Sequence, residues 1–195
     1  MPKVVDVEQR RTELAAAVAR VIARSGIEGA SMRQVATEAG WTTGTLVHYF
    51  TNKRELLQFT LCESLDRRRA QRFDRAELGP REAIRHTLLN ALPITEESRL
   101  HWIVTVAFTA QAHSDPSLST TQRDAYREFR SYLAELILDD GAASTRDDAT
   151  IEAERLIALV DGLALQALFD PDSWPPERQR QALDVGLELG VGVSA

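Results

Sequence analysis

The sequence has one cysteine, Cys62, in 195 residues. A single thiol excludes an intrachain disulfide framework and fits a reducing compartment, so we expect a cytoplasmic protein. The first residues are charged and contain no apolar signal-peptide core, so no secretory leader is expected. The most apolar stretch, residues 151–169, includes Asp, Glu and Arg, which makes it a poor bilayer span and a good buried helix. We therefore expect no membrane association.

Sequence patterns that signal catalysis are also missing. The four histidines show no tight metal-binding spacing, and Cys62 has no patterned partner. There is no glycine-rich phosphate loop and no G-x-S-x-G elbow. The chain is thus not expected to be an enzyme, and we expect neither a metal site nor a cofactor.

Charge is distributed unevenly along the chain. The formal net charge is −6, which looks wrong for a protein that binds a polyanion. Residues 1–54, however, hold eight Lys or Arg against five Asp or Glu, whereas residues 55–195 hold fifteen against twenty-four. Chance clustering can produce such a difference, but a basic N-terminal segment on an acidic body favours contact of that segment alone with a polyanion.

The pattern of apolar residues predicts an all-α fold of about nine helices, with neither strand alternation nor an internal repeat. Leu14, Val18 and Ile22 share one face of a first helix, which Gly26 ends. Three later starts carry their own signals: Ser31 with Gln34 as a capping box, Thr42 or Thr43 before a short helix, and Asn52 with Glu55. The expected helices span about 8–25, 31–40, 42–49, 52–75, 80–92, 95–112, 116–138, 151–169 and 177–191.

Ala36, Gly40 and Leu46 have the spacing of a helix-turn-helix motif. A small residue at Ala36 permits close crossing of two helices, and Gly40 can adopt the positive φ of a sharp turn. Leu46, with Val35 and Phe50, can point back into the core of the first helix. The remaining residues of the third helix face outward and are short enough to enter a major groove; they are Thr42, Thr43, Thr45, Val47 and His48. Amide groups at the helix starts near Ser31 and Asn52 are available to phosphates.

The segment "GIEGASMRQVATEAGWTTGTLVHYFTNKRELL" resembles the DNA-binding head of TetR-type bacterial transcriptional regulators. The resemblance covers roughly residues 8–57 and is specific in the run "T-x-G-T-L-x-x-Y-F" followed by "x-N-K-x-x-L". The later "LVDGLALQALFDP" resembles the penultimate helix of family members whose regulatory domain dimerises. Two domains are therefore expected: a helix-turn-helix DNA-binding domain over 1–54 and a ligand-binding and dimerisation domain over 55–195.

The resemblance implies roles for residues of the head. Contacts to the operator backbone are implied for Ser31, Thr43, Tyr49 and Lys53. Contacts to base edges are implied for Arg33, Thr42, Gly44, Val47 and His48. An N-terminal arm with Lys3, Arg10 and Arg11 adds positive charge. Val47 stands where the family often has a large residue; it can touch a thymine methyl group but cannot donate a hydrogen bond.

A dimer interface is expected from the last two helices, because a helix apolar on nearly all sides must be buried on two. Pairing these helices with their copies would make a four-helix interface; the alternative is that they close a monomeric core. The predicted interface residues are Leu156, Val160, Gly162, Leu163, Leu183, Gly186, Leu187 and Gly190. A partly apolar cavity is expected to bind a small molecule, with contacts from Phe59, Cys62, His86, Leu89, Trp102, Thr105, Thr109, Tyr126, Phe129, Arg130, Asp161 and Gln166.

These observations predict a homodimeric, ligand-responsive transcriptional regulator. A repressor that binds a palindromic operator on double-stranded DNA and is released by a small-molecule effector fits them best. An activator would share every residue assignment. The rival from another class is a helical ligand-binding or hydrolytic protein without specific DNA binding, whose N-terminal segment is only a packing module.

Overall fold

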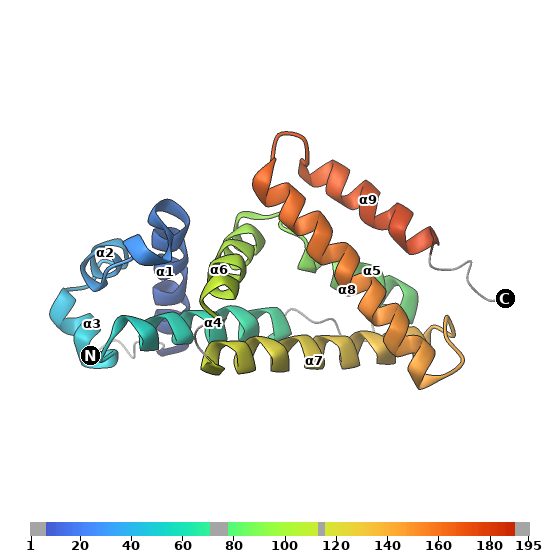
Figure 1. Ribbon diagram of the computed structural model, residues 1–195, viewed down its shortest axis with the longest axis horizontal. Helices are drawn as coiled ribbons and strands as arrows, with labels where there is room; N and C mark the ends of the chain where they lie inside the picture. Colours follow the sequence, from blue (N-terminus) through green and yellow to red (C-terminus); the bar gives the residue numbers. More distant parts are fainter. Residues whose placement is uncertain (1–6, 71–77, 113–115, 190–195) are drawn as a thin grey trace, which may run out of the picture. The chain divides into compact units, whose positions relative to one another are not determined.

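The computed structural model describes residues 7–70, 78–112 and 116–189, and within these ranges it contains nine helices and no strand (Figure 1). The all-α prediction is confirmed. The helices are α1 Val7–Gly29, α2 Met32–Glu38, α3 Thr43–Tyr49, α4 Lys53–Ala70, α5 Pro80–Ala91, α6 Glu96–Ala112, α7 Pro116–Asp139, α8 Arg146–Phe169 and α9 Pro176–Leu189.

The predicted helix signals account for most boundaries. Thr42 caps α3, Asn52 caps the start of α4 by accepting a hydrogen bond from the Glu55 amide at 3.0 Å, and Pro80 occupies the first turn of α5. Gly26 has a φ of 68° and a ψ of 172°, which breaks the regular helix at this residue, and a separate helical turn follows to Gly29. The prediction that Gly26 ends the first helix is therefore confirmed.

The start of α8 also differs from the prediction. We expected a polar loop to residue 148 and a helix from Ile151, but α8 begins at Arg146. The Thr145 side chain accepts a hydrogen bond from the Asp148 amide at 3.1 Å, and Asp147 lies in the first turn, where the helix dipole favours negative charge. The polar composition of this segment therefore belongs to a capped helix start.

The described residues fall into two compact units. Residues within 1–70 and 103–121 form the first unit, and those within 71–102 and 122–195 form the second. The end of α6 and the start of α7 thus group with α1 to α4. The predicted domains divide the chain once, at residue 54. The two packed units instead each combine segments that are separate in the sequence.

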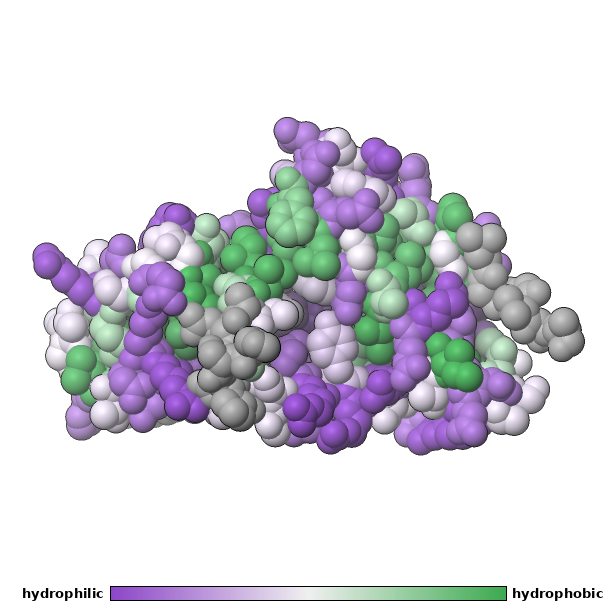
Figure 2. All heavy atoms as spheres, viewed as in Figure 1, coloured by the Kyte–Doolittle hydropathy of each residue, from purple (hydrophilic) through white to green (hydrophobic). Residues whose placement is uncertain are grey.

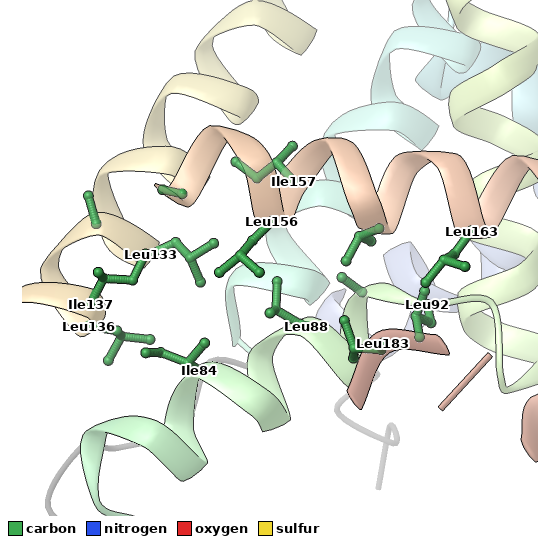
Figure 3. Packing of buried hydrophobic residues seen from close by; sticks show 14 of the residues in the cluster. Ile84, Leu88, Leu92, Leu133, Leu136, Ile137, Leu156, Ile157, Leu163 and Leu183 are labelled. Carbon is green, nitrogen blue, oxygen red and sulfur yellow. The ribbon is translucent and has the colours of Figure 1, made fainter. Parts of the chain in front are cut away.

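The second unit is built around one apolar core. Side chains from α5, α7, α8 and α9 point toward one another in Figure 3, where Leu88, Leu133, Leu156 and Leu183 lie close to its centre. Each of these leucines is at most 2% exposed. An ion pair joins α5 to α9 beside the core: Arg85 Nε donates to Asp184 Oδ1 at 2.7 Å, and this hydrogen bond lowers the pKa of Asp184.

Candidate nucleic-acid interface

The segment from Ser31 to Thr45 forms two capped helices with a sharp turn between them. The Ser31 hydroxyl accepts a hydrogen bond from the Gln34 amide at 3.3 Å, and the Ser31 amide donates to Gln34 Oε1 at 3.0 Å. The predicted capping box is therefore present. Gly40 has a φ of 68°, which side chains disfavour, and it turns the chain toward Thr42. The Thr42 hydroxyl then accepts from the Thr45 amide at 3.0 Å.

Helix α3 is held to the rest of the chain by one buried side chain. Leu46 is fully buried, as are Val18 and Val35, so the predicted anchor is in place. The other six residues of α3 are exposed. Val47 is 52% exposed and Tyr49 60%, which is unusual for large apolar and aromatic side chains on so short a helix. Almost the whole side-chain surface of α3 is therefore accessible to a binding partner.

Three aromatic rings lie in a row at this surface. The Trp41 and Tyr49 ring centroids are 5.6 Å apart, and the His48 ring meets Tyr49 edge-on at 5.7 Å. Trp41 lies in the turn just before the Thr42 cap and is half-buried. The sequence patterns predict no role for Trp41, although an aromatic side chain next to a predicted cap is a signal that could have indicated one.

The start of α4 lies beside α3 in sequence and carries two cations. Lys53 is half-buried, and its Nζ donates to the Glu28 carbonyl at 3.1 Å, which leaves an ammonium with further donors. Arg54 donates to Ser117 Oγ at 3.0 Å, within the first unit. Arg33 and Arg10 are exposed.

Arg11 differs from the other cations predicted for the DNA-binding arm. Its Nε donates to Glu63 Oε1 at 3.0 Å, and its guanidinium lies 4.9 Å from the centre of the Phe59 ring. Phe59 in turn packs on Phe50, with ring centroids 5.1 Å apart. Arg11 therefore joins α1 to α4 within the first unit, and its predicted contribution to the positive charge of the N-terminal arm stays a prediction. Lys3 lies outside the described residues.

The twelve residues predicted to bind an effector belong to both units. Four lie in the first unit: Phe59, Cys62, Thr105 and Thr109. Eight lie in the second: His86, Leu89, Trp102, Tyr126, Phe129, Arg130, Asp161 and Gln166. Burial raises the pKa of the Cys62 thiol, so it carries little negative charge at neutral pH.

Within the second unit, α7 and α8 share a polar contact next to the apolar core. The Tyr126 hydroxyl donates to Asp161 Oδ2 at 2.9 Å, and both residues are half-buried. Arg130 pairs with Glu154 at 3.0 Å on the surface. Trp102 is 7% exposed and donates its indole N–H to the Ala91 carbonyl at 2.7 Å, which is a packing role. The Gln166 side chain is exposed on the surface of the single chain.

Four of the residues predicted for a dimer interface lie in the core of a single chain instead. These are Leu156, Val160, Leu163 and Leu183, each at most 5% exposed. They stabilise α8 and α9 but offer no surface to a second copy. Gly186 likewise serves packing within the chain, since a Cβ there would lie 2.3 Å from Leu159 Cδ2. Leu187 is half-buried, and Gly190 lies outside the described residues.

The apolar side chains that these helices do expose are different ones. On α8 they are Ile151, Leu165 and Phe169, which are 65%, 37% and 80% exposed; on α9 it is Val185, which is 55% exposed. The α8 residues recur at helical spacing along one stripe. Hydrophobic side chains are visible over α8 in Figure 2.

Comparison with known families matches both parts of the chain. A family model described as "Bacterial regulatory proteins, tetR family" matches residues 14–58, and one described as "BetI-type transcriptional repressor, C-terminal" matches residues 80–190. The second match covers more than half of the sequence. The chain belongs to the TetR family.

Individual relatives agree with this assignment. The HTH-type transcriptional regulator PksA of Bacillus subtilis is 40% identical over 174 residues, which is 88% of this chain and 84% of that protein. A transcriptional regulator from Rhodococcus sp. Rha1 has a solved structure that is 34% identical, with a TM-score of 0.80 over 92% of this chain and 94% of that chain. A structure from Saccharomonospora viridis, solved in complex with choline, shares the fold at 24% identity and a TM-score of 0.78 over 92% and 96% of the two chains.

Members of the TetR family are transcriptional regulators rather than enzymes, and this TetR-family chain is accordingly a DNA-binding regulator with a ligand-binding C-terminal part. TetR regulators bind DNA operators and small-molecule effectors, typically as dimers. Among the described residues, none of the helices is both long and apolar enough to span a bilayer.

Proposed function

We propose that this TetR-family protein is a cytoplasmic, homodimeric repressor that binds a palindromic operator and leaves it when a small-molecule effector binds. The observation that carries the proposal is the exposure of α3. One residue of this helix, Leu46, is fully buried, while the other six are exposed. A capped helix anchored by a single leucine, with Thr43, Gly44 and Thr45 small at its start, can enter a major groove without losing its own packing.

We propose that the head uses the nine residues predicted from the sequence. Phosphate contacts fall to Ser31, Thr43, Tyr49 and Lys53. Base-edge contacts fall to Arg33, Thr42, Gly44, Val47 and His48. Most of these residues are exposed, and Lys53 is half-buried with donors to spare. Phosphate contacts set the register, and the α3 side chains then read the sequence.

The exposed stripe on α8 supports a dimer. Ile151, Ala158, Leu165 and Phe169 lie on one face of the helix and are all exposed in a single chain. Gly162 falls on the same stripe, and a Cβ there would meet nothing within 4 Å, so its own chain does not require a glycine. Close approach of a second α8 at Gly162 would explain this residue and would bury the stripe. Two copies also supply two recognition helices for a two-fold symmetric site.

We propose that the effector binds through predicted residues of the second unit, with the Tyr126 and Asp161 pair supplying polar contacts. The mechanism is a shift between two spacings of the recognition helices. An effector can change this equilibrium only by as much as its affinity differs between the two states.

Selection of bound fragments from random and genomic duplexes tests the proposal. We expect an enriched site with two-fold symmetry, bound more tightly at low salt than at high salt because phosphate contacts release counterions. The rival reading, a helical ligand-binding or hydrolytic protein, gives no enrichment over random DNA. Addition of small, partly apolar molecules to the selected complex then identifies those that release it, and Asp161→Asn should weaken their effect.

A further inference from the structure

Trp41 is fixed by its backbone but is free of hydrogen bonds at its side chain. Its backbone amide donates to the Ala36 carbonyl at 2.8 Å, which closes the turn after α2. Within the described part of the chain, its indole N–H has no hydrogen-bond partner. The ring packs on Tyr49, at 5.6 Å between centroids and 50° between planes. This is a tilted aromatic pair at favourable distance.

The other two tryptophans have evident structural roles. Trp102 is buried and donates to the Ala91 carbonyl at 2.7 Å. The guanidinium carbon of Arg178 lies over the Trp174 ring, 4.6 Å from the ring centroid. Trp41 alone among the three packs on a residue of the candidate DNA-binding surface. Because Trp41 is half-buried and packs on Tyr49, we ask what this contact does for Tyr49.

An exposed tyrosine that must reach one phosphate oxygen has to be ordered. Tyr49 is 60% exposed and lies in the last turn of a seven-residue helix, where little else constrains its side chain. Ordering such a side chain on binding reduces affinity, whereas a neighbour that holds it in advance removes that loss. Trp41 lies on one side of the ring, and His48 meets it edge-on.

We propose that Trp41 is a positioning residue for operator binding, which holds the Tyr49 ring so that its hydroxyl is already directed at a phosphate. The inference rests on the proposed function, because it assumes that Tyr49 contacts the operator. Trp41 itself makes no contact with DNA in this proposal. The indole acts through the ring contact, so a phenylalanine at this position should largely replace it.

The test measures operator affinity of four variants: Trp41→Ala, Trp41→Phe, Tyr49→Phe, and Tyr49→Phe with Trp41→Ala. We expect Trp41→Ala to weaken binding roughly three- to tenfold, as loss of an aromatic pair does. Trp41→Phe should bind nearly as well as wild type. In the Tyr49→Phe background the hydroxyl is gone, so the added Trp41→Ala change should have little effect. Thermal unfolding of each variant shows that the head remains folded.

Three outcomes would overturn the inference. An equal loss from Trp41→Ala with and without the Tyr49 hydroxyl would show that Trp41 acts independently of Tyr49. An equal loss in Trp41→Phe and Trp41→Ala would show that the indole N–H binds DNA directly. Unchanged affinity in Tyr49→Phe would remove the phosphate role of Tyr49 while leaving operator binding intact. By contrast, a wild-type protein that selects no operator would refute the proposed function itself.

Discussion

The carboxylate of Glu38, at the end of α2, accepts a hydrogen bond from Arg20 Nε on α1 at 2.6 Å. Arg24, one turn further along α1, donates to the second oxygen of the same carboxylate, also at 2.6 Å. Glu38 therefore binds α2 to two successive turns of α1. Because α2 leads directly into the turn and α3, this pairing sets the position of the recognition helix.

Glu38→Gln should lower the free energy of unfolding in a pH-dependent way. The hydrogen bonds from Arg24 and Arg20 lower the pKa of Glu38 from 4.5 to about 2. A lowered folded-state pKa gives stability that is complete above the unfolded value and is lost as pH falls through the folded value. We expect the wild-type advantage to be constant above about pH 5 and to shrink from there toward pH 2, and to fall with added salt because the arginines are exposed. Urea unfolding at pH 7, 4 and 3 checks this, and an advantage that grows in acid would contradict it.

Substitutions at two glycines of the motif should have opposite effects on stability. Gly40 has a φ of 68° with open space around it, so Gly40→Ala should destabilise through backbone strain alone, by roughly 1 kcal/mol. Gly44 is helical, and a Cβ there would lie 3.8 Å from Thr42 Oγ1, an ordinary contact. Gly44→Ala should therefore raise stability by a few tenths to about 1 kcal/mol while weakening operator binding, because the methyl group occupies the base-edge surface. Paired melting and binding measurements test both, and tight binding by Gly44→Ala would remove Gly44 from the interface.

Leu46→Ala should detach the recognition helix from the head. The side chain is fully buried, so its truncation is expected to cost about 2–5 kcal/mol and to abolish operator binding. Val47→Ala is the matched control, since Val47 is 52% exposed. That variant should keep wild-type stability and change only which base is preferred at one operator position. Loss of stability in Val47→Ala, or none in Leu46→Ala, would reverse the assignment of the two faces of α3.

Phe169→Glu and Gly162→Leu should both weaken the dimer without unfolding the chain. Phe169 is 80% exposed, and a Cβ at Gly162 would meet nothing within 4 Å in one chain, so we expect neither change to unfold the monomer. A buried charge or an added side chain at the interface should raise the dimer dissociation constant by tenfold or more. Sedimentation at micromolar concentration measures this, with operator affinity as the second readout. Wild-type protein that sediments as a monomer would remove the α8 interface.

Lys53→Ala should weaken binding to all DNA sequences alike and lower the salt slope of binding by about 1, as loss of one phosphate contact does. Lys53 Nζ also donates to the Glu28 carbonyl, so the change removes a hydrogen bond within the head. Lys53→Gln is the matched control, because its amide can keep that hydrogen bond without the charge. Both variants should lower the slope of log affinity against log salt concentration by the same amount. An unchanged slope would refute the phosphate role.

Local signals in the sequence predicted local structure well. The capping box at Ser31, the turn at Gly40 and the cap at Thr42 each depend on neighbours within a few residues, so one short segment determines them. The contact of Arg11 with Glu63 joins residues 52 positions apart, and no pattern near Arg11 signals it. The sequence therefore shows the positive charge of Arg11 but not the partner with which it pairs.

The dimer prediction failed for some residues because periodicity has a specific limit. It correctly identified α8 as apolar on more than one side. It could not decide which side faces its own chain, since that depends on where α5, α7 and α9 pack. Leu156 and Leu163 were therefore assigned outward, whereas Ile151 and Phe169 are the exposed residues. The positions of the predicted effector residues in the fold also depend on contacts between segments distant in the sequence, so local patterns could not predict them.

The single leucine that anchors α3 also has an evolutionary consequence. Since Leu46 alone links this helix to the hydrophobic interior, replacements at neighbouring surface positions such as Val47 and His48 leave the folding energy almost untouched. The DNA sequence that the protein prefers can then change through a few substitutions on α3 while the rest of the protein stays the same.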